Sequence, residues 1–305
     1  MKKTLKLLFF LALPLTLSGQ LTPYSNQYML NPLAINPAFA GNRGILNMTA
    51  FYRKQWVGVK GSPETISLTA DIPFSNNKMG LGLSILNDKL GVTRETQLSS
   101  SYAYKIAMKK GTLSFGLSAG LVMTNTAWSD LIVIDPGDEF ILVDSKVFLV
   151  PTFSFGTWYA GEKYFAGFSV PRLVGYKFDF EKNKYVLNNN MNDYYYQFNT
   201  GYLIGISSDL KFVPSVLVSY SPKDNILYDI NAHLRMMDRF WVGASYRNGR
   251  AFAAMFQVQL TNQIKCAYTY DFDFAKLRTF SSGSHEIMFR YEFRYRVEAI
   301  SPLNF

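Results

Sequence analysis

Residues 64–72 have the sequence ETISLTADI, and this stretch decides the fold class. Every second residue is apolar and the residues between are polar, so an extended chain has one apolar and one polar face. The apolar positions are Ile66, Leu68, Ala70 and Ile72. The whole chain is 48% hydrophobic yet has a mean hydropathy near zero, so apolar and polar residues are interleaved along it. This period of two predicts half-buried β-strands rather than helices.

The same alternation continues over almost the whole chain after residue 44 and divides it into fourteen predicted strands. They span about residues 45–56, 64–73, 79–87, 94–106, 111–123, 147–160, 163–170, 193–205, 210–221, 225–235, 239–247, 251–260, 263–273 and 284–295. One strand with its connection then takes about 20 residues, which suits a transmembrane barrel whose tilted strands have about ten residues each. The even number of strands is typical of bacterial outer-membrane barrels.

Two soluble architectures, the β-sandwich and the β-propeller, show the same alternation with the apolar face inward. The size of the ring decides against them, because fourteen strands enclose a lumen too wide for one apolar core to fill. Tyrosines also lie near strand ends, where barrels place aromatic girdles at the lipid interfaces. These are Tyr52, Tyr102, Tyr104, Tyr194, Tyr196, Tyr246, Tyr291 and Tyr295. The predicted fold is therefore all-β, a transmembrane antiparallel β-barrel with an apolar exterior.

The N-terminus predicts a secretory signal peptide at residues 1–19. Three lysines precede an apolar core over residues 7–17, which is too short to span a membrane, and cleavage before Gln20 fits the small residues after the core. No other apolar run approaches the about 20 residues of a membrane helix, so a polytopic helical protein is excluded. Cys266 is the only cysteine, and an exported chain without disulfides suits a bacterial envelope.

Neither the charges nor the histidines indicate nucleic-acid binding or catalysis. The net charge of +9 is spread without a basic block, so no nucleic-acid partner is expected. His233 shares the polar face of a strand with Asp229, Asn231 and Arg235, a row that a wet lumen produces without any catalytic role. The acidic residues between 135 and 144 lack the ligand spacing of a calcium loop. We therefore assign no enzyme activity, metal or cofactor.

The connections differ in length in a way that orients the barrel. The long connections, residues 124–146 and 171–192, follow the fifth and seventh strands, whereas short turns follow the second, fourth and sixth. Outer-membrane barrels have long loops outside and short turns in the periplasm, so both termini are predicted to be periplasmic. The short turn at residues 221–224 follows the ninth strand and is an exception, either a short outer loop or an error in the strand count.

Several segments together resemble the PorP/SprF family, outer-membrane proteins of the type IX secretion system of Bacteroidetes. They are residues 27–41 (QYMLNPLAINPAFAG), 53–56 (RKQW), 61–65 (GSPET), 80–83 (GLGL) and 283–288 (GSHEIM). The resemblance extends from about Gln20 to the last strand and covers nearly the whole mature chain. Its central third is typical of barrels in general.

The resemblance implies a barrel that is not an enzyme and that takes part in protein secretion and gliding motility. Its implied partners are outer-membrane lipid, a large secreted protein with a C-terminal sorting domain, and periplasmic components of the secretion system. The resemblance further implies a role in exporting such proteins or in anchoring adhesins at the cell surface. A plugged or gated channel for small solutes is the main alternative function, and a soluble β-rich binding protein is a third.

Residues 20–43 are predicted to form an N-terminal segment separate from the barrel at residues 44–305. The segment has no alternation, is too apolar for a solvated tail, and contains prolines that prevent a long helix and remove strand donors. Its irregular backbone must therefore be sheltered by protein, either as a plug of the lumen, which we favour, or by docking on a periplasmic partner. The residues for either role are Tyr28, Met29, Asn31, Pro32, Asn36, Pro37, Phe39 and Gly41.

Charged residues within the last two strands are predicted to face the lumen, because each would cost a few kcal/mol if it faced lipid, and Arg53 and Gln55 of the first strand are expected to join them. We expect them to line the seam where the first and last strands meet. They are Arg53, Gln55, Asp271, Asp273, Arg290, Glu292 and Arg294. Two interpretations remain, a pairing network that stiffens the barrel, which we favour, and a polar surface that receives a peptide.

Overall fold

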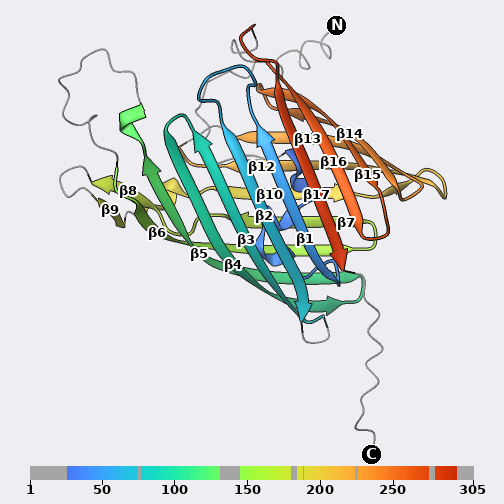
Figure 1. Ribbon diagram of the computed structural model, residues 1–305. Coiled ribbons are helices and arrows are strands. Elements are labelled where there is room, and N and C mark those ends of the chain that lie inside the picture. Colours follow the sequence, from blue (N-terminus) through green and yellow to red (C-terminus); the bar gives the residue numbers. More distant parts are fainter. Residues whose placement is uncertain are drawn as a thin grey trace, which may run out of the picture.

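Antiparallel strands make up most of the structure, a computed structural model that describes residues 26–74, 77–130, 145–179, 184–187, 189–223, 226–274 and 279–293. Fourteen strands, β1 to β7, β10 and β12 to β17, form a closed ring (Figure 1). Their bounds are β1 Leu46–Lys54, β2 Glu64–Phe74, β3 Met79–Leu90, β4 Thr93–Met108, β5 Gly111–Thr126, β6 Phe148–Gly161, β7 Tyr164–Val170, β10 Tyr196–Tyr202, β12 Leu210–Tyr220, β13 Leu227–Met236, β14 Phe240–Arg247, β15 Ala251–Gln259, β16 Ile264–Asp273 and β17 Ser284–Phe293. The predicted fourteen-stranded barrel is confirmed.

Each strand of the ring pairs with its neighbours in the chain, and β1 pairs with β17 to close the barrel. The closing pair extends along all of β1, from Leu46 opposite Phe293 to Lys54 opposite His285. Three short strands accompany the ring: β8 (Tyr176–Asp179) and β9 (Lys184–Leu187) form a hairpin, and β11 (Ile204–Gly205) pairs with β12. No helix among the described residues is long and apolar enough to cross a membrane.

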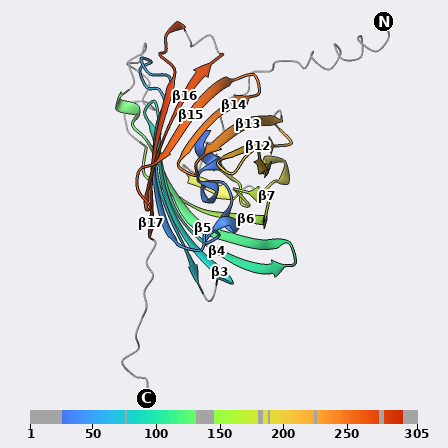
Figure 2. The same cartoon turned by 90° about the vertical axis from the view of Figure 1, so that its right-hand side faces the viewer.

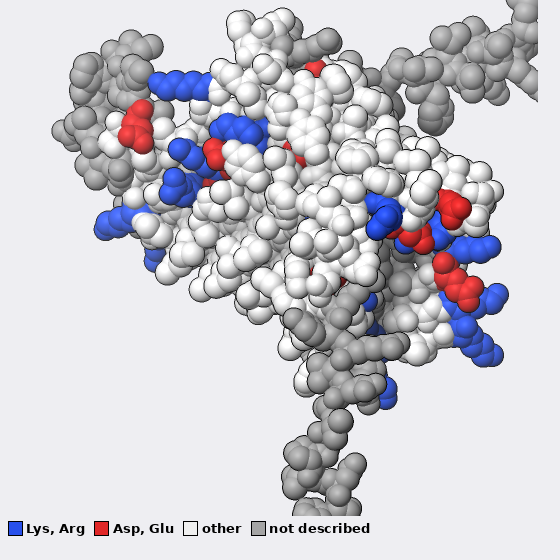
Figure 3. Space-filling view, turned by 45° about the vertical axis from the view of Figure 1, so that its right-hand side comes forward, with Lys and Arg blue, Asp and Glu red and all other residues white. Residues whose placement is uncertain are grey.

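The outer surface is apolar and the inner surface is polar, as the alternation predicts. On β3, Leu83 is 48% exposed on the outside, whereas its neighbour Ser84 is half-buried and faces the lumen. Figure 3 shows a broad uncharged band on the outside, with most of the lysine, arginine and acidic side chains toward its two ends. Tyr52, Tyr102 and Tyr246 of the predicted girdles are exposed. Tyr295 lies outside the described residues.

The connections follow the predicted division between the two ends of the barrel. Residues 127–147 and 171–195 connect strands at one end, which we call the long-loop end, and the turns after β2, β4 and β6 lie at the other, the short-turn end. The connection after β12, predicted as the exception, is a short one at the long-loop end. It needs no change in the strand count. Tight turns at the short-turn end use left-handed residues, such as Met237 and Asp238 between β13 and β14.

The described part of the chain before β1 runs inside the ring (Figure 2). It contains three short 3-10 helices, η2 (Asn26–Met29), η3 (Pro32–Ala34) and η4 (Pro37–Phe39). Two more, η5 (Trp128–Asp130) and η6 (Met191–Asp193), lie in the long connections. We call residues 26–43 the lumenal segment. Its side chains and those of the strands meet in the middle of the barrel.

Candidate functional site

Prolines and asparagines determine the local shape of the lumenal segment. Pro32 and Pro37 each begin a 3-10 helix, where a missing backbone N–H costs no hydrogen bond. Asn36 caps the second of these helices by accepting a hydrogen bond from the backbone N–H of Ala38 at 3.0 Å. Asn31 stands at the equivalent place before η3 but makes no such cap. The repeated Asn-Pro pairs therefore produce two tight bends.

The beginning of the segment is held by the wall made of β12 to β17. Asn231 Nδ2 donates to the Tyr28 hydroxyl at 2.5 Å, and Ser215 lies 3.3 Å from the Met29 sulfur. Leu30 packs in a small apolar cluster with Met255, Ala267 and Met288. Tyr28 and Leu30 are almost fully buried, which explains the high apolar content that the sequence shows here.

The middle of the segment is held by the opposite wall. Asn31 donates to the Thr69 hydroxyl at 3.0 Å. The Asn36 amide donates to the backbone oxygens of Thr157 at 2.9 Å and Phe168 at 3.1 Å. These two carbonyls belong to neighbouring strands, β6 and β7, so one buried amide connects both strands to the segment.

The end of the segment leads toward β1, and Phe39 and Gly41 fix its path. The Phe39 ring meets Trp158 edge to face at 5.1 Å between centroids, and the Arg43 guanidinium lies 4.9 Å from the same Phe39 ring centroid. Gly41 has a positive φ of 64°, which favours glycine. Its N–H donates to Asp71 at 3.0 Å, and its carbonyl accepts a hydrogen bond from the Lys105 amine.

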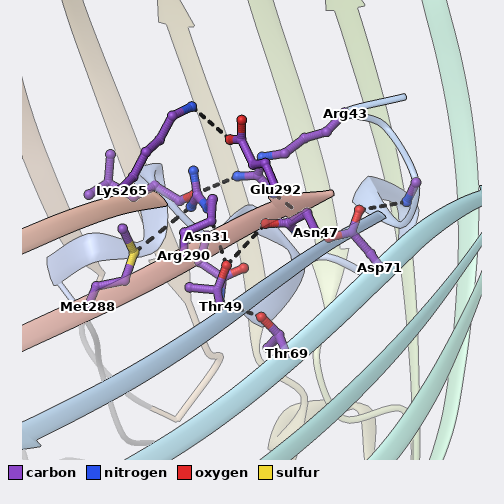
Figure 4. A network of polar contacts seen from close by, with 12 residues as sticks. Asn31, Arg43, Asn47, Thr49, Thr69, Asp71, Lys265, Met288, Arg290 and Glu292 are labelled. Atoms are coloured by element: carbon purple, nitrogen blue, oxygen red, sulfur yellow. Dashed lines mark hydrogen bonds and ion pairs between the residues drawn. The ribbon is translucent and has the colours of Figure 1, made fainter. Parts of the chain in front are cut away.

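A network of polar contacts joins the segment to the seam between β1 and β17 (Figure 4). The Leu30 carbonyl accepts hydrogen bonds from Arg43, at 2.5 Å, and from Arg290. Arg290 also donates to Thr49 at 3.2 Å. Close by, Lys265 pairs with Glu292 at 2.7 Å. The network therefore connects the first strand, the last strand and the lumenal segment.

Asp71 is the acidic centre of this network on β2. It accepts hydrogen bonds from Gly41 and Asn47, and lies 3.8 Å from the Arg43 guanidinium. Burial lowers the pKa of Arg43 below its ordinary value, and the nearby carboxylates of Asp71 and Glu292 oppose that shift. The position of Asp71 on the polar face of its strand could have shown that it faces the lumen, but its partners could not be predicted.

A second polar cluster lies on the same seam, closer to the long-loop end. Arg53 on β1 pairs with Glu286 on β17 at 2.6 Å and with Asp271 on β16 at 2.8 Å, and all three side chains are almost fully buried. Asp273 accepts a hydrogen bond from Ser284 at 3.2 Å. Gln55 is buried directly after the last residue of β1. The sequence had not singled out Glu286 as a partner of Arg53.

The structure thus brings the predicted seam residues into two groups, one around Arg290 and Glu292 and one around Arg53, Asp271 and Asp273. Arg294 lies outside the described residues. Among the residues that the structure describes, no group of three or more His, Cys, Asp or Glu side chains could hold a metal ion. The acidic residues between 135 and 144 fall outside that part of the chain, and His233 is buried on the lumen side of β13.

A cavity of about 170 Å³ lies between the lumenal segment and the long-loop end. Residues 33–37 form part of its lining, together with β-strand side chains that are mostly hydroxyls and amides. They include Ser84, Ser99, Ser101, Ser118, Ser154, Gln97 and Gln197. Glu95 and Arg172 also line it and pair at 3.5 Å. The lining also includes apolar side chains, among them Leu33, Ile35 and Leu86, so the cavity offers both hydrogen bonds and apolar contacts.

The sequence matches, over residues 17–291, the family described as type IX secretion system membrane protein PorP/SprF. The chain belongs to this family. The resemblance found in the sequence is thereby confirmed, and a membrane β-barrel of a PorP/SprF protein points to the outer membrane. Among curated proteins, none matches the sequence significantly.

Two solved structures are similar in fold to this PorP/SprF protein. The CymD monoaromatic hydrocarbon channel has 13% sequence identity and a TM-score of 0.50, with 91% of this chain and 95% of that chain covered. The toluene transporter TbuX of Ralstonia pickettii has 10% identity and a TM-score of 0.50, with coverage of 86% and 93%. At these identities the likeness concerns the fold alone.

Proposed function

We propose that this PorP/SprF protein is a non-enzymatic outer-membrane barrel of the type IX secretion and gliding machinery. It binds a large secreted surface protein through the C-terminal sorting domain of that protein, and helps to export or anchor it. The family match over residues 17–291 is the observation that carries the proposal. Periplasmic components of the secretion system are the further partners we expect.

The lumenal segment acts in this proposal as a plug. Its contacts with both walls of the barrel support this role, because Tyr28 is held on β13 and Asn36 on β6 and β7. A segment buried on both sides restricts the free passage of solutes. Docking of the same residues on a periplasmic component is the other role we consider, and it requires the segment to leave the lumen.

The orientation follows from the connections. The long-loop end faces the outside and the short-turn end, with the start of β1 and the end of β17, faces the periplasm. In this orientation the cavity beside residues 33–37 opens toward the cell exterior, where a secreted protein would be retained. The charged side chains of the seam stiffen the barrel, since Arg53 and Arg290 are paired with neighbouring strands or with the segment.

A plugged or gated channel for small solutes is the second candidate function. The cavity favours it, and TbuX and CymD, which share the fold, are named as a transporter and a channel for aromatic compounds. The hydroxyls and amides of the lining can exchange hydrogen bonds with a polar solute. The lumenal segment opposes an open pore, so this function requires the segment to move.

Affinity purification and conductance measurements distinguish the two functions. We expect the tagged full-length protein to copurify a large secreted protein with a sorting domain, and to lose it when that domain is deleted from the partner. Planar bilayers containing the purified protein should show little conductance. High conductance without any sorting-domain-dependent partner would contradict the proposal and support the channel.

Deletion of residues 22–40 tests the role of the segment. If the segment is the plug, the deletion should raise single-channel conductance and sensitise cells to large antibiotics. If it docks a secretion component, permeability should stay low while surface display of the partner falls. If the deletion variant assembles and changes neither permeability nor surface display of the partner, both proposed roles of the segment are wrong.

A further inference from the structure

Four small residues form a row across the inner wall of the barrel. Gly80 on β3 lies directly opposite Ala103 on β4, Ala103 lies opposite Gly116 on β5, and Gly116 lies opposite Gly156 on β6. Opposite residues of antiparallel strands stand side by side, so the row runs across the strands rather than along them. We call these four residues the glycine track. It is a shallow groove without side chains larger than a methyl group.

Residues 36–41 of the lumenal segment lie in this groove. A Cβ atom on Gly156 would overlap the Asn36 side chain, and one on Gly116 would overlap the backbone of Ala38. A Cβ atom on Gly80 would overlap the backbone of Ala40 in the same way. The track therefore admits the segment at three places only because its residues are glycines.

Both ends of the seated stretch are fixed by hydrogen bonds. At one end the Asn36 amide donates to two strand carbonyls, and at the other the Gly41 N–H donates to Asp71. Between them Ala38 and Ala40 have no exposed surface, so the wall leaves no room for larger side chains. The groove thus selects an Asn, small residues two and four positions after it, and a Gly at the fifth.

The other Asn-Pro pair of the segment has a larger residue at the second position after the Asn, and it binds differently. In the sequence 31–34 (NPLA), Leu33 stands where the seated sequence 36–39 (NPAF) has Ala38. Leu33 lies beside Gly82, one row closer to the long-loop end, with its side chain 3.2 Å from where a Cβ of Gly82 would stand. The larger Leu33 packs in one apolar cluster with Ala40 and with Ala103 of the track, and Asn31 binds the Thr69 side chain instead of strand carbonyls.

We propose that the glycine track is a peptide-binding site, occupied in cis by residues 36–41 and able to take a peptide of the same pattern in trans. Its ligand is a short bent peptide that begins with Asn-Pro, has small residues at the second and fourth positions after the Asn, and ends in Gly. This inference rests on the contacts of the track and holds whether or not the barrel has a secreted partner. The cis stretch then keeps the site closed to competing peptides until it is displaced.

A photo-reactive peptide tests the site in the full-length chain. The peptide has the sequence of residues 31–43, with benzoylphenylalanine in place of Phe39, which lies against Trp158. We expect it to label the double variant Asn36→Leu, Ala38→Leu, whose own segment cannot seat, at least tenfold more than the native protein. The label should map to β6. A peptide carrying Leu in place of Ala38 should not label either protein.

Two further variants show whether the label reports the track. Adding Gly116→Val to the double variant should reduce labelling at least tenfold. Adding Ser118→Val, which puts the same side chain on the lumenal face of β5 two residues away, should leave it unchanged. Absence of labelling in a folded double variant, or labelling that Gly116→Val does not reduce, would overturn the proposal.

If the double variant does not assemble, the track can instead be freed by cutting the segment from a barrel that has already folded. A protease site inserted after Gly44, which is exposed, allows the segment to be cut from an assembled barrel. The cut segment should then exchange with the labelled peptide, and unlabelled native peptide should compete. Failure of the cut barrel to take up the peptide would overturn the proposal as well.

Discussion

Neighbouring residues of β3 face opposite sides of the barrel wall, with Leu83 on the apolar outer surface and Ser84 on the lumen side. Single substitutions at these two positions test which side faces lipid. Leu83→Arg places a charge on the apolar outer band and should destabilise the barrel by about 2 to 4 kcal/mol. Ser84→Arg points into the cavity that Ser84 lines, where water and polar groups surround the charge. We therefore expect Leu83→Arg to reduce assembly strongly and Ser84→Arg to reduce it less, as measured by the heat-modifiable band of the folded barrel on gels. Equal loss from both, or the reverse order, would mean that the faces are assigned backwards.

At the residue scale, the sequence predicts which way a side chain points but not what it touches. The alternation places Asp71 and Arg290 on polar faces, because adjacent residues of a strand point to opposite sides. Their contacts with Gly41 and Leu30 join residues far apart in the chain, and no local pattern encodes such a pair. Gly116 looks like any small residue of a barrel strand. Its role emerges only when the lumenal segment lies on it.

At the scale of elements, the strands were predictable in detail and the lumenal segment only in outline. Each strand follows from its own alternation, which is local, and the predicted bounds differ from the observed ones by a few residues, as at β10 and β13. The prolines of residues 20–43 predicted an irregular, sheltered backbone. They could not predict which wall shelters each part, since that depends on where distant strands place Asn231, Thr69 and Thr157. The β8 and β9 hairpin within the predicted loop 171–192 was also missed.

The seam between β1 and β17 contains a cluster of buried charges around Arg53. Arg53→Met leaves Asp271 and Glu286 without their common cation, and removing one partner of a buried ion pair costs about 3 to 5 kcal/mol. We expect the temperature at which the folded band disappears on gels to fall markedly. The matched control is Lys54→Met, the next residue, whose pair with Glu64 is about one-third exposed and is worth less than about 1 kcal/mol. Similar effects of both variants would show that the Arg53 cluster contributes little to closing the barrel.

At the scale of the whole molecule, three features agree on one architecture. The outer band is apolar, the lumen is lined with paired charges and hydroxyls, and the lumenal segment spans the space between the two walls. A segment held on β13, β6 and the seam together resists removal from any one side, because its contacts with the different walls would have to break together. The barrel and its lumenal segment therefore form one structural unit.

Cysteine labelling tests which end of the barrel faces the cell exterior. In a Cys266→Ser background, Ser129→Cys and Asn189→Cys place thiols in the two long connections, where both native residues are exposed. We expect a membrane-impermeant maleimide to label them on intact cells, because long loops of outer-membrane barrels face outside. Lys110→Cys and Lys163→Cys, at exposed positions of the short-turn end, are the controls and should react only after permeabilisation. Labelling of the short-turn cysteines on intact cells, with the long-loop cysteines protected, would reverse the orientation and would place the cavity beside residues 33–37 on the periplasmic side.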